Sequence, residues 1–101
     1  SLHDALPICR RVVAFGGHDS WLREIRFKVP DVRFMGENIS NAEIIRRADV
    51  IWIQTNCIGH AAYYGVINLA RRYNRKVRYF RYASAAKCAE QIAEEEEKSK
   101  E

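Results

Sequence analysis

Residues 50–56 read VIWIQTN, in which four apolar side chains in succession are followed by three polar ones. A strand that helices cover on both faces of a parallel sheet has this unbroken apolar character. The apolar runs at residues 11–15, 32–35 and 77–82 are typical of strands as well. We therefore expect residues 50–53 to be a buried strand of a four-stranded sheet.

Apolar side chains at helical spacing fill the intervals between these runs. The first interval opens with Asp19 and Ser20, either of which is suited to cap a helix, and Pro30 would end it. The sequence SNAE at residues 40–43 fits a capping box, and Ser84 is suited to cap the last helix. Helices are therefore expected from Asp19 or Ser20 to Val29, over residues 41–48, over residues 60–73, and from residue 85 onward.

Strands and helices are thus expected to alternate along the chain. Strict alternation with short connections favours a parallel sheet with right-handed crossovers, and small doubly wound folds have the strand order 2-1-3-4. We predict an α/β fold of Rossmann-like or flavodoxin-like type, with helices on both faces of the sheet. Residues 9–93 would form this single domain and residues 94–101 a charged helix end or frayed tail. Residues 1–8 would be a non-native or disordered leader, the native chain then beginning elsewhere.

The composition limits the class of protein. The chain has 101 residues, 48% hydrophobic and 30% charged, which predicts one small globular domain and excludes a disordered chain. Five glycines, two prolines and three cysteines exclude collagen-like and disulfide-scaffold proteins, and the odd cysteine count favours reduced thiols in the cytoplasm. The uncharged stretch at residues 50–70 contains glutamine, threonine, asparagine and histidine, so no membrane span is expected.

A polar cluster follows the first expected strand and consists of Gly16, Gly17, His18, Asp19 and Ser20. Glycines let a backbone approach a ligand closely, and amides at the start of a helix carry partial positive charge that attracts phosphate or carboxylate groups. The GxGxxG and GxxxxGK[ST] patterns are both missing here, so the cluster predicts an anion site but identifies no cofactor. The alternative is a tight turn in which Asp19 and Ser20 only cap the helix.

A second polar cluster, Gln54, Thr55, Asn56 and His60, follows the buried strand. In a 2-1-3-4 sheet the first and third strands are neighbours whose helices go to opposite faces, and ligands bind at the crevice where those strands end. Together the two clusters predict one site for a small anionic ligand, a nucleotide or another phosphate compound. The alternative is a helix start that Thr55 or Asn56 caps. Glu37 is a weaker candidate, as acceptor for a ribose hydroxyl.

The same site would serve an enzyme acting on a phosphorylated substrate, with His18 and His60 as acid and base. No nucleophile with an adjacent base and an orienting acid is evident, so a binding function is favoured over catalysis. The spacing of Cys57 and His60 suits zinc, but the sequence does not gather four ligands around it. No metal is therefore expected.

A basic stretch offers a different alternative. The net charge is +4, and no acidic residue lies between Cys57 and Ala89. Bases interleaved with aromatic residues can contact phosphates and stack on nucleic-acid bases, which makes a nucleic-acid module an alternative. A solvated surface, or a sheet edge protected from mispairing, would carry the same charges. The bases concerned are Arg71, Arg72, Arg75, Lys76 and Arg78. A homodimer through that edge or the Glu-rich helix end, or an N-terminal partner domain, is a further alternative.

The motifs GGHDSW, ADVIWIQTNCIGHAAYY and KVRYFRYASAAKCAEQI resemble the bacterial family called domain of unknown function 2325. The resemblance covers about residues 11–93. It implies a small Rossmann-like domain, often at the C-terminus of longer bacterial proteins, and implies no activity or substrate. Cys57 stands where the family pattern has an aromatic residue, which weakens a zinc site further. The signature positions would be Gly16, Gly17, His18, Ser20, Trp21, Gln54, Thr55, Asn56 and His60.

Overall fold

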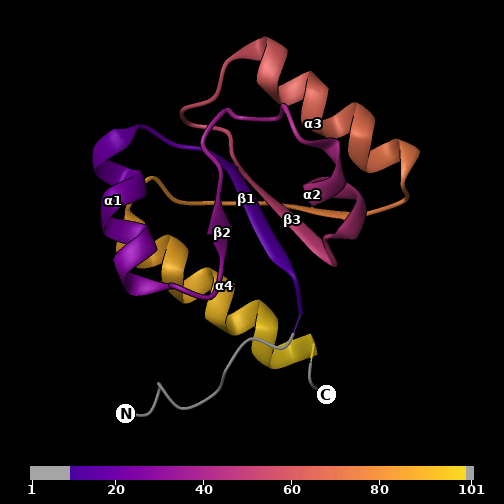
Figure 1. Ribbon diagram of the computed structural model, residues 1–101. Coiled ribbons are helices and arrows are strands. Elements are labelled where there is room, and N and C mark those ends of the chain that lie inside the picture. Colours follow the sequence, from indigo (N-terminus) through magenta and orange to yellow (C-terminus); the bar gives the residue numbers. More distant parts are fainter. Residues whose placement is uncertain (1–9, 100–101) are drawn as a thin grey trace.

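The computed structural model describes residues 10–99, in which strands and helices alternate throughout (Figure 1). The predicted leader at residues 1–8 lies outside these residues, as do the last two of residues 94–101. The elements are β1 (Val12–Gly16), α1 (Asp19–Lys28), β2 (Arg33–Phe34), α2 (Ala42–Arg47), β3 (Val50–Gln54), α3 (His60–Arg72), β4 (Lys76–Tyr79) and α4 (Ala85–Ser99).

The strands form one parallel sheet in the order β2-β1-β3-β4, so the predicted doubly wound α/β fold is confirmed. The central pair is in register along its whole length, from Val12 opposite Val50 to Gly16 opposite Gln54. The end of the sheet at which the strands begin is called the amino edge below, and the other end the carboxyl edge. Gly16 and Gln54 therefore face each other at the carboxyl edge, where their loops start.

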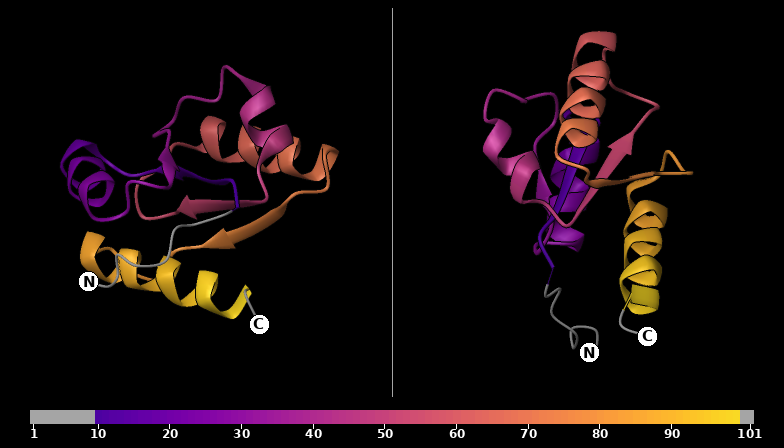
Figure 2. Two further views of the ribbon diagram at one scale, coloured as in Figure 1. Left: turned by 60° about the horizontal axis from the view of Figure 1, so that its bottom comes forward. Right: turned by 90° about the vertical axis from the view of Figure 1, so that its right-hand side faces the viewer.

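Helices cover both faces of the sheet (Figure 2). On the face of α1 and α4, the side chain of Trp52 stacks on Phe80 with ring centroids 4.8 Å apart, and Trp21 meets Phe80 edge-on at 5.6 Å. On the face of α2 and α3, Ile51 and Ile53 pack within a second apolar cluster. Every residue of β3 is buried because both faces of this strand are covered, as its apolar run indicates.

Two strands are shorter than predicted. The chain joins the sheet only at Arg33 because the amide of Val32 donates to Val29 O in the turn after α1, at 3.3 Å. The strand on the opposite side of the sheet, β4, stops at Tyr79 and not at residue 82. Beyond it, the amide of Phe80 still donates to Ile53 O at 3.1 Å, the ring of Phe80 packs against Trp52, and Tyr82 O accepts from Gln54 at the carboxyl edge.

The helix caps differ in part from the prediction. His18 is the N-cap of α1 and makes no side-chain capping bond among residues 10–99, whereas Asp19 and Ser20, the predicted caps, lie in the first turn. In α2 the cap is Asn41, whose Oδ1 accepts from the amide of Glu43 at 3.0 Å. Ser84 does cap α4, as its Oγ accepts from the amide of the third helical residue at 3.3 Å. Periodicity locates a helix but does not decide which neighbouring polar residue adopts the cap conformation.

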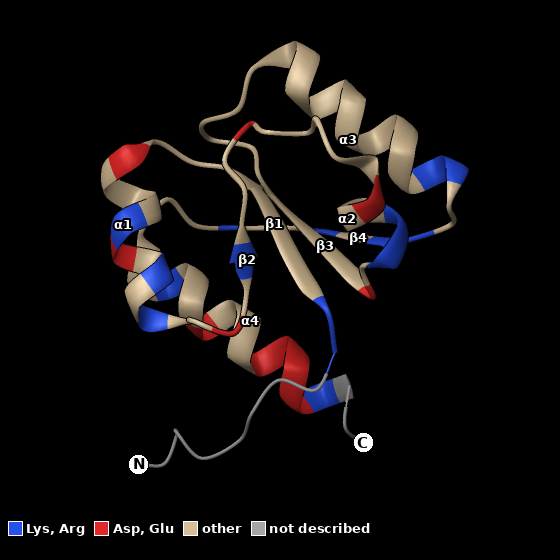
Figure 3. Cartoon of the chain, viewed as in Figure 1, with Lys and Arg blue, Asp and Glu red and all other residues tan. Residues whose placement is uncertain are grey.

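Basic side chains occupy the last turn of every described helix (Figure 3). Because helices in this fold run opposite to the strands, these turns gather toward the amino edge of the sheet. Positive charge there is favourable beside the partial negative charge of a helix C-terminus. Much of the basic character of the chain is therefore explained without a ligand. The residues are Arg26, Lys28, Arg46, Arg47, Arg71, Arg72 and Lys98. None of the helices described has the length and apolar character needed to cross a bilayer.

Candidate functional site

The loops after the first three strands are bonded to one another at the carboxyl edge. The amide of Gly16 donates to Gly36 O at 2.6 Å, and the amide of Gly17 donates to Cys57 O at 2.7 Å. The loop that carries His18 therefore lies against the loop that carries Asn56. These contacts follow from the register, because β1 lies between β2 and β3 and all three strands end at the same edge.

The two glycines serve this packing. Both have positive φ, 94° at Gly16 and 96° at Gly17. A Cβ at Gly16 would lie 2.7 Å from Gln54 O, and one at Gly17 would lie 2.3 Å from the ring of Trp21. Neighbouring protein, not a ligand, therefore approaches these positions closely, and both amides are already donated. These two amides are therefore already bonded within the protein at the start of the cluster that is expected to hold an anion.

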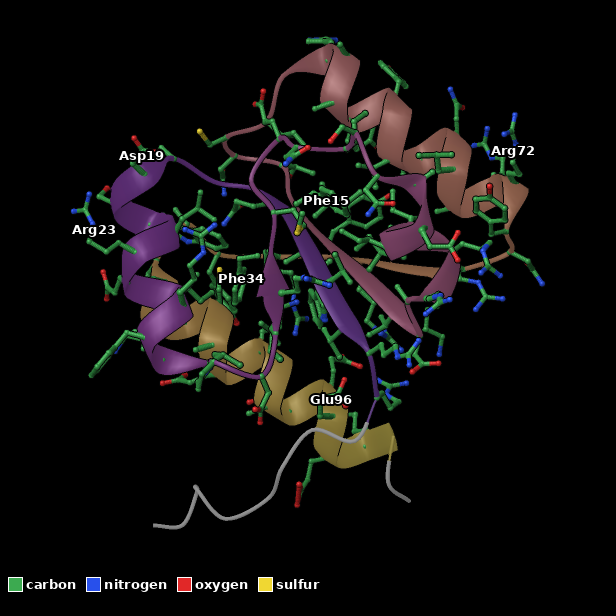
Figure 4. The ribbon with its side chains drawn as sticks, in the orientation of Figure 1. Phe15, Asp19, Arg23, Phe34, Arg72 and Glu96 are labelled. Atoms are coloured by element: carbon green, nitrogen blue, oxygen red, sulfur yellow. The ribbon has the colours of Figure 1, made fainter. Side chains whose placement is uncertain are left out.

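The remaining donors of this loop belong to the start of α1. The first amide within the helix that bonds back is that of Leu22, which donates to His18 O at 2.9 Å, so the preceding first-turn amides have no intrahelical acceptor. His18, Asp19 and Ser20 are exposed. The Oγ of Ser20 lies 3.1 Å from Nδ1 of His18. Asp19 projects at the helix start (Figure 4) and adds negative charge there.

Gln54 is a buried supporting residue. Its side chain is 2% exposed, and both ends of its amide are bonded within the protein. Nε2 donates to Tyr82 O at 3.0 Å, and Oε1 accepts from N and Nδ2 of Asn56 at 3.2 and 3.1 Å. Gln54, which with Asn56 was one of two candidates to orient a ligand, therefore holds two loops together.

Thr55, Asn56 and His60 are exposed on the third loop and at the start of α3. The N-cap is Gly59, so the alternative that Thr55 or Asn56 caps this helix is wrong. The ring of His60 lies 6.3 Å from that of Tyr64, one helical turn further along. His60 therefore stands beside an aromatic surface at the carboxyl edge.

Glu37 has a definite place in this site. Its Oε2 accepts from the amide of Gly59 at 2.7 Å, so a carboxylate from the second loop sits at the N-terminus of α3. Negative charge is favourable there because the amides at a helix start carry partial positive charge. An external anion approaching α3 would meet this carboxylate first.

The loop after β4 and the start of α4 supply two residues that the sequence analysis did not assign to this site. Tyr82 is 40% exposed, and Nζ of Lys87 lies 5.5 Å from the centroid of its ring. The carbonyl of Tyr82 accepts from Gln54, which brings this loop to the same edge. The sequence does show an aromatic residue, Tyr82, and a basic residue, Lys87, on either side of the cap Ser84. This pattern was not used because residues 77–82 were expected to form a strand.

The described residues offer no set of three or more His, Cys, Asp or Glu side chains positioned for a metal ion. Cys57 and Cys88 are free thiols. Burial raises the pKa of Cys88, which keeps its thiol protonated and unreactive at neutral pH.

The basic stretch divides into parts with different partners. Arg75 donates to the carbonyls of Tyr73 and Ala48, and Arg78 forms an ion pair with Glu95 at 3.3 Å. Arg71, Arg72 and Lys76 are exposed at the end of α3 and the start of β4, which lie toward the amino edge. Figure 4 shows Arg72 at the end of α3 that is away from the polar loops. The five bases therefore do not form one uninterrupted surface.

The fold and this edge define the class of molecule, a small doubly wound α/β domain with a polar cluster at its topological switch point. Comparisons with models of known protein families, with curated proteins and with solved structures find no match. The resemblance to the 2325 family stays a prediction.

Proposed function

We propose that this chain is a ligand-binding domain that holds a small anionic ligand, a nucleotide or another phosphate compound, where β1 and β3 end. The observation that carries the proposal is the bond between Gly17 and Cys57, which joins two polar loops from distant parts of the sequence at the switch point of the sheet. Open α/β sheets bind ligands at this position.

The donors for the anion would be the first-turn amides of α1, together with His18 and Ser20. Amides at a helix start attract negative charge, and the hydroxyl and imidazole add adjustable hydrogen bonds. Asn56 and His60 would contact the ligand from the side opposite to α1, and the buried Gln54 would hold Asn56 in place. Asp19 and Glu37 limit the ligand, since a large polyanion would meet both carboxylates. These charges favour one phosphate group on an organic body.

Calorimetric titration with a panel of nucleotides and sugar phosphates tests the proposal. His18→Ala should weaken binding about tenfold or more, because a hydrogen bond to a charged group contributes roughly 1.5–3 kcal/mol. Asn56→Ala should weaken it too. Asn68→Ala, which removes an exposed amide from the middle of α3, is the matched control and should bind like the wild type. Equal heats for all four proteins would defeat the proposal.

A second candidate function is catalysis on a phosphorylated substrate, favoured by the 3.1 Å contact between Ser20 Oγ and His18 Nδ1. A hydroxyl beside an imidazole is the start of a nucleophile–base pair. Turnover of phosphoesters that is lost in Ser20→Ala and His60→Ala but kept in Arg78→Ala would support an enzyme. Equal turnover in all these variants would assign the activity to a contaminant.

The nucleic-acid alternative rests on three of the five bases, the exposed Arg71, Arg72 and Lys76. It requires binding that weakens steeply as salt rises, because each phosphate contact releases counterions. Salt-independent binding would exclude it. A cytoplasmic location, suggested by the odd cysteine count, is part of the proposal as well.

A further inference from the structure

A hollow of about 540 Å³ lies at the amino edge, between the start of β1, the strand β2 and helix α2. Four arginines line it against two carboxylates. These are Arg10, Arg11, Arg33 and Arg47, with Asp31 and Glu43. The hollow is far from the polar loops, since β1 begins beside it and ends at the carboxyl edge, roughly 15 Å further along.

The shortness of β2 creates the hollow. Only Arg33 and Phe34 pair with β1, so the start of β1 has no strand beside it on that side. Phe34 is buried in the core under α1, and Arg33, which alternates with it, is exposed and lines the hollow together with residues of α2. Val12 and Val13 of β1 supply apolar lining.

The arginines differ in whether their guanidinium groups are bonded to other described residues. Arg10 donates two hydrogen bonds to Glu96, and Arg47 pairs with Glu43 at 3.1 Å. The guanidinium groups of Arg11 and Arg33 have no hydrogen-bond or ion-pair partner among residues 10–99. A helix dipole does not explain their presence either, because one precedes β1 and the other lies on β2. Two guanidinium groups without a partner among the described residues therefore line the same hollow, Arg33 from β2 and Arg11 from the position just before β1.

We propose that this hollow binds a small polyphosphorylated anion, with Arg11 and Arg33 as its principal contacts. The planar guanidinium matches two phosphate oxygens at once. The volume lies in the range of small-molecule sites and exceeds what a single phosphate fills. Arg47 stands on the α2 side as a third cation, and the valines offer apolar surface to an organic part of the ligand.

Titration calorimetry with tripolyphosphate and with ATP tests the site on the whole chain. The double variant Arg11→Ala/Arg33→Ala should weaken both ligands at least about tenfold, as expected for lost hydrogen bonds between charged groups. Arg23→Ala removes one positive charge from the outer side of α1 (Figure 4) and should leave both affinities unchanged. Weaker binding of tripolyphosphate than of ATP would show that the apolar lining contributes.

Three outcomes would overturn the proposal. The first is a double variant that binds like the wild type, and the second is an Arg23→Ala variant that loses as much affinity as the double variant, which would indicate unspecific attraction. The third is loss of tripolyphosphate binding in His18→Ala with none in the double variant, which would move the site to the carboxyl edge. The same variants separate this proposal from the one made for the polar loops, because neither site shares a residue with the other.

Discussion

Replacing Gln54 with methionine removes a buried amide while nearly keeping its length and volume. The native amide makes three hydrogen bonds at 3.0–3.2 Å, one to the carbonyl of Tyr82 and two from Asn56, and a longer one from Nε2 to Sγ of Cys88 at 3.6 Å. Each such bond contributes about 0.5–1.5 kcal/mol net. Part of the loss is offset, because Tyr82 O still accepts from the thiol of Cys88 at 3.2 Å and Asn56 is exposed to water. We expect Gln54→Met to lower the free energy of unfolding by about 2–3 kcal/mol.

Urea denaturation followed by tryptophan fluorescence measures this change, since Trp21 and Trp52 are both buried. Gln91→Met is the matched control. Gln91 is also buried and bonds Arg81 N and Tyr79 O, so a comparable loss of stability is expected from it. Only Gln54→Met should also weaken ligand binding at the carboxyl edge. A stability loss below about 0.5 kcal/mol for Gln54→Met, or equal effects of both variants on binding, would refute the reasoning.

Three further changes test other contacts. Gly17→Ala should cost about 3 kcal/mol or more in a thermal denaturation, because it combines a positive φ with a Cβ placed against Trp21; an unchanged melting temperature would contradict this. Hydrogen bonding to Arg46 lowers the pKa of Glu43 to about 2 from 4.5, so its contribution to stability is present above pH 4.5 and is lost as the pH falls toward 2. Arg46→Ala should flatten that loss in denaturation curves recorded from pH 5 to pH 2, and identical profiles would show that the pair contributes nothing. Glu37→Gln should strengthen binding of inorganic phosphate in calorimetry, since it removes a competing carboxylate; weaker binding of nucleosides alone would instead assign this residue to a ribose.

The sequence was sufficient for the fold because its signals are repetitive. The unbroken apolar run at residues 50–53, three further runs and helical spacing between them all indicate the same alternation, and the topology rules leave few arrangements for it. The ends of β2 and β4 were not predictable, because they depend on single bonds. Val32 gives its amide to a turn, and the amide of Phe80 still donates to Ile53 O of β3 although β4 ends at Tyr79.

The meeting of the polar loops that form the candidate site was predictable in position and less so in detail. Neighbouring strands that end at one edge bring their loops together, whatever the loops contain. The backbone path decides which polar side chains face solvent. In the sequence, Gln54 and Asn56 are equally good candidates, although Gln54 is buried and Asn56 is exposed. The place of Glu37 at the start of α3 depends on a bond between two loops, Glu37 to Gly59, that no local pattern encodes.

The ends of α1, α2 and α3 gather basic residues on the amino-edge side of the domain, where the end of α4 adds an acidic run. A sulfonate or heparin matrix would capture the molecule by the amino edge and leave the opposite end turned to the buffer. Immobilisation on such a matrix would block the arginine-lined hollow and spare the polar loops. Whether the adsorbed protein still binds a given ligand would thus show at which end of the domain that ligand binds.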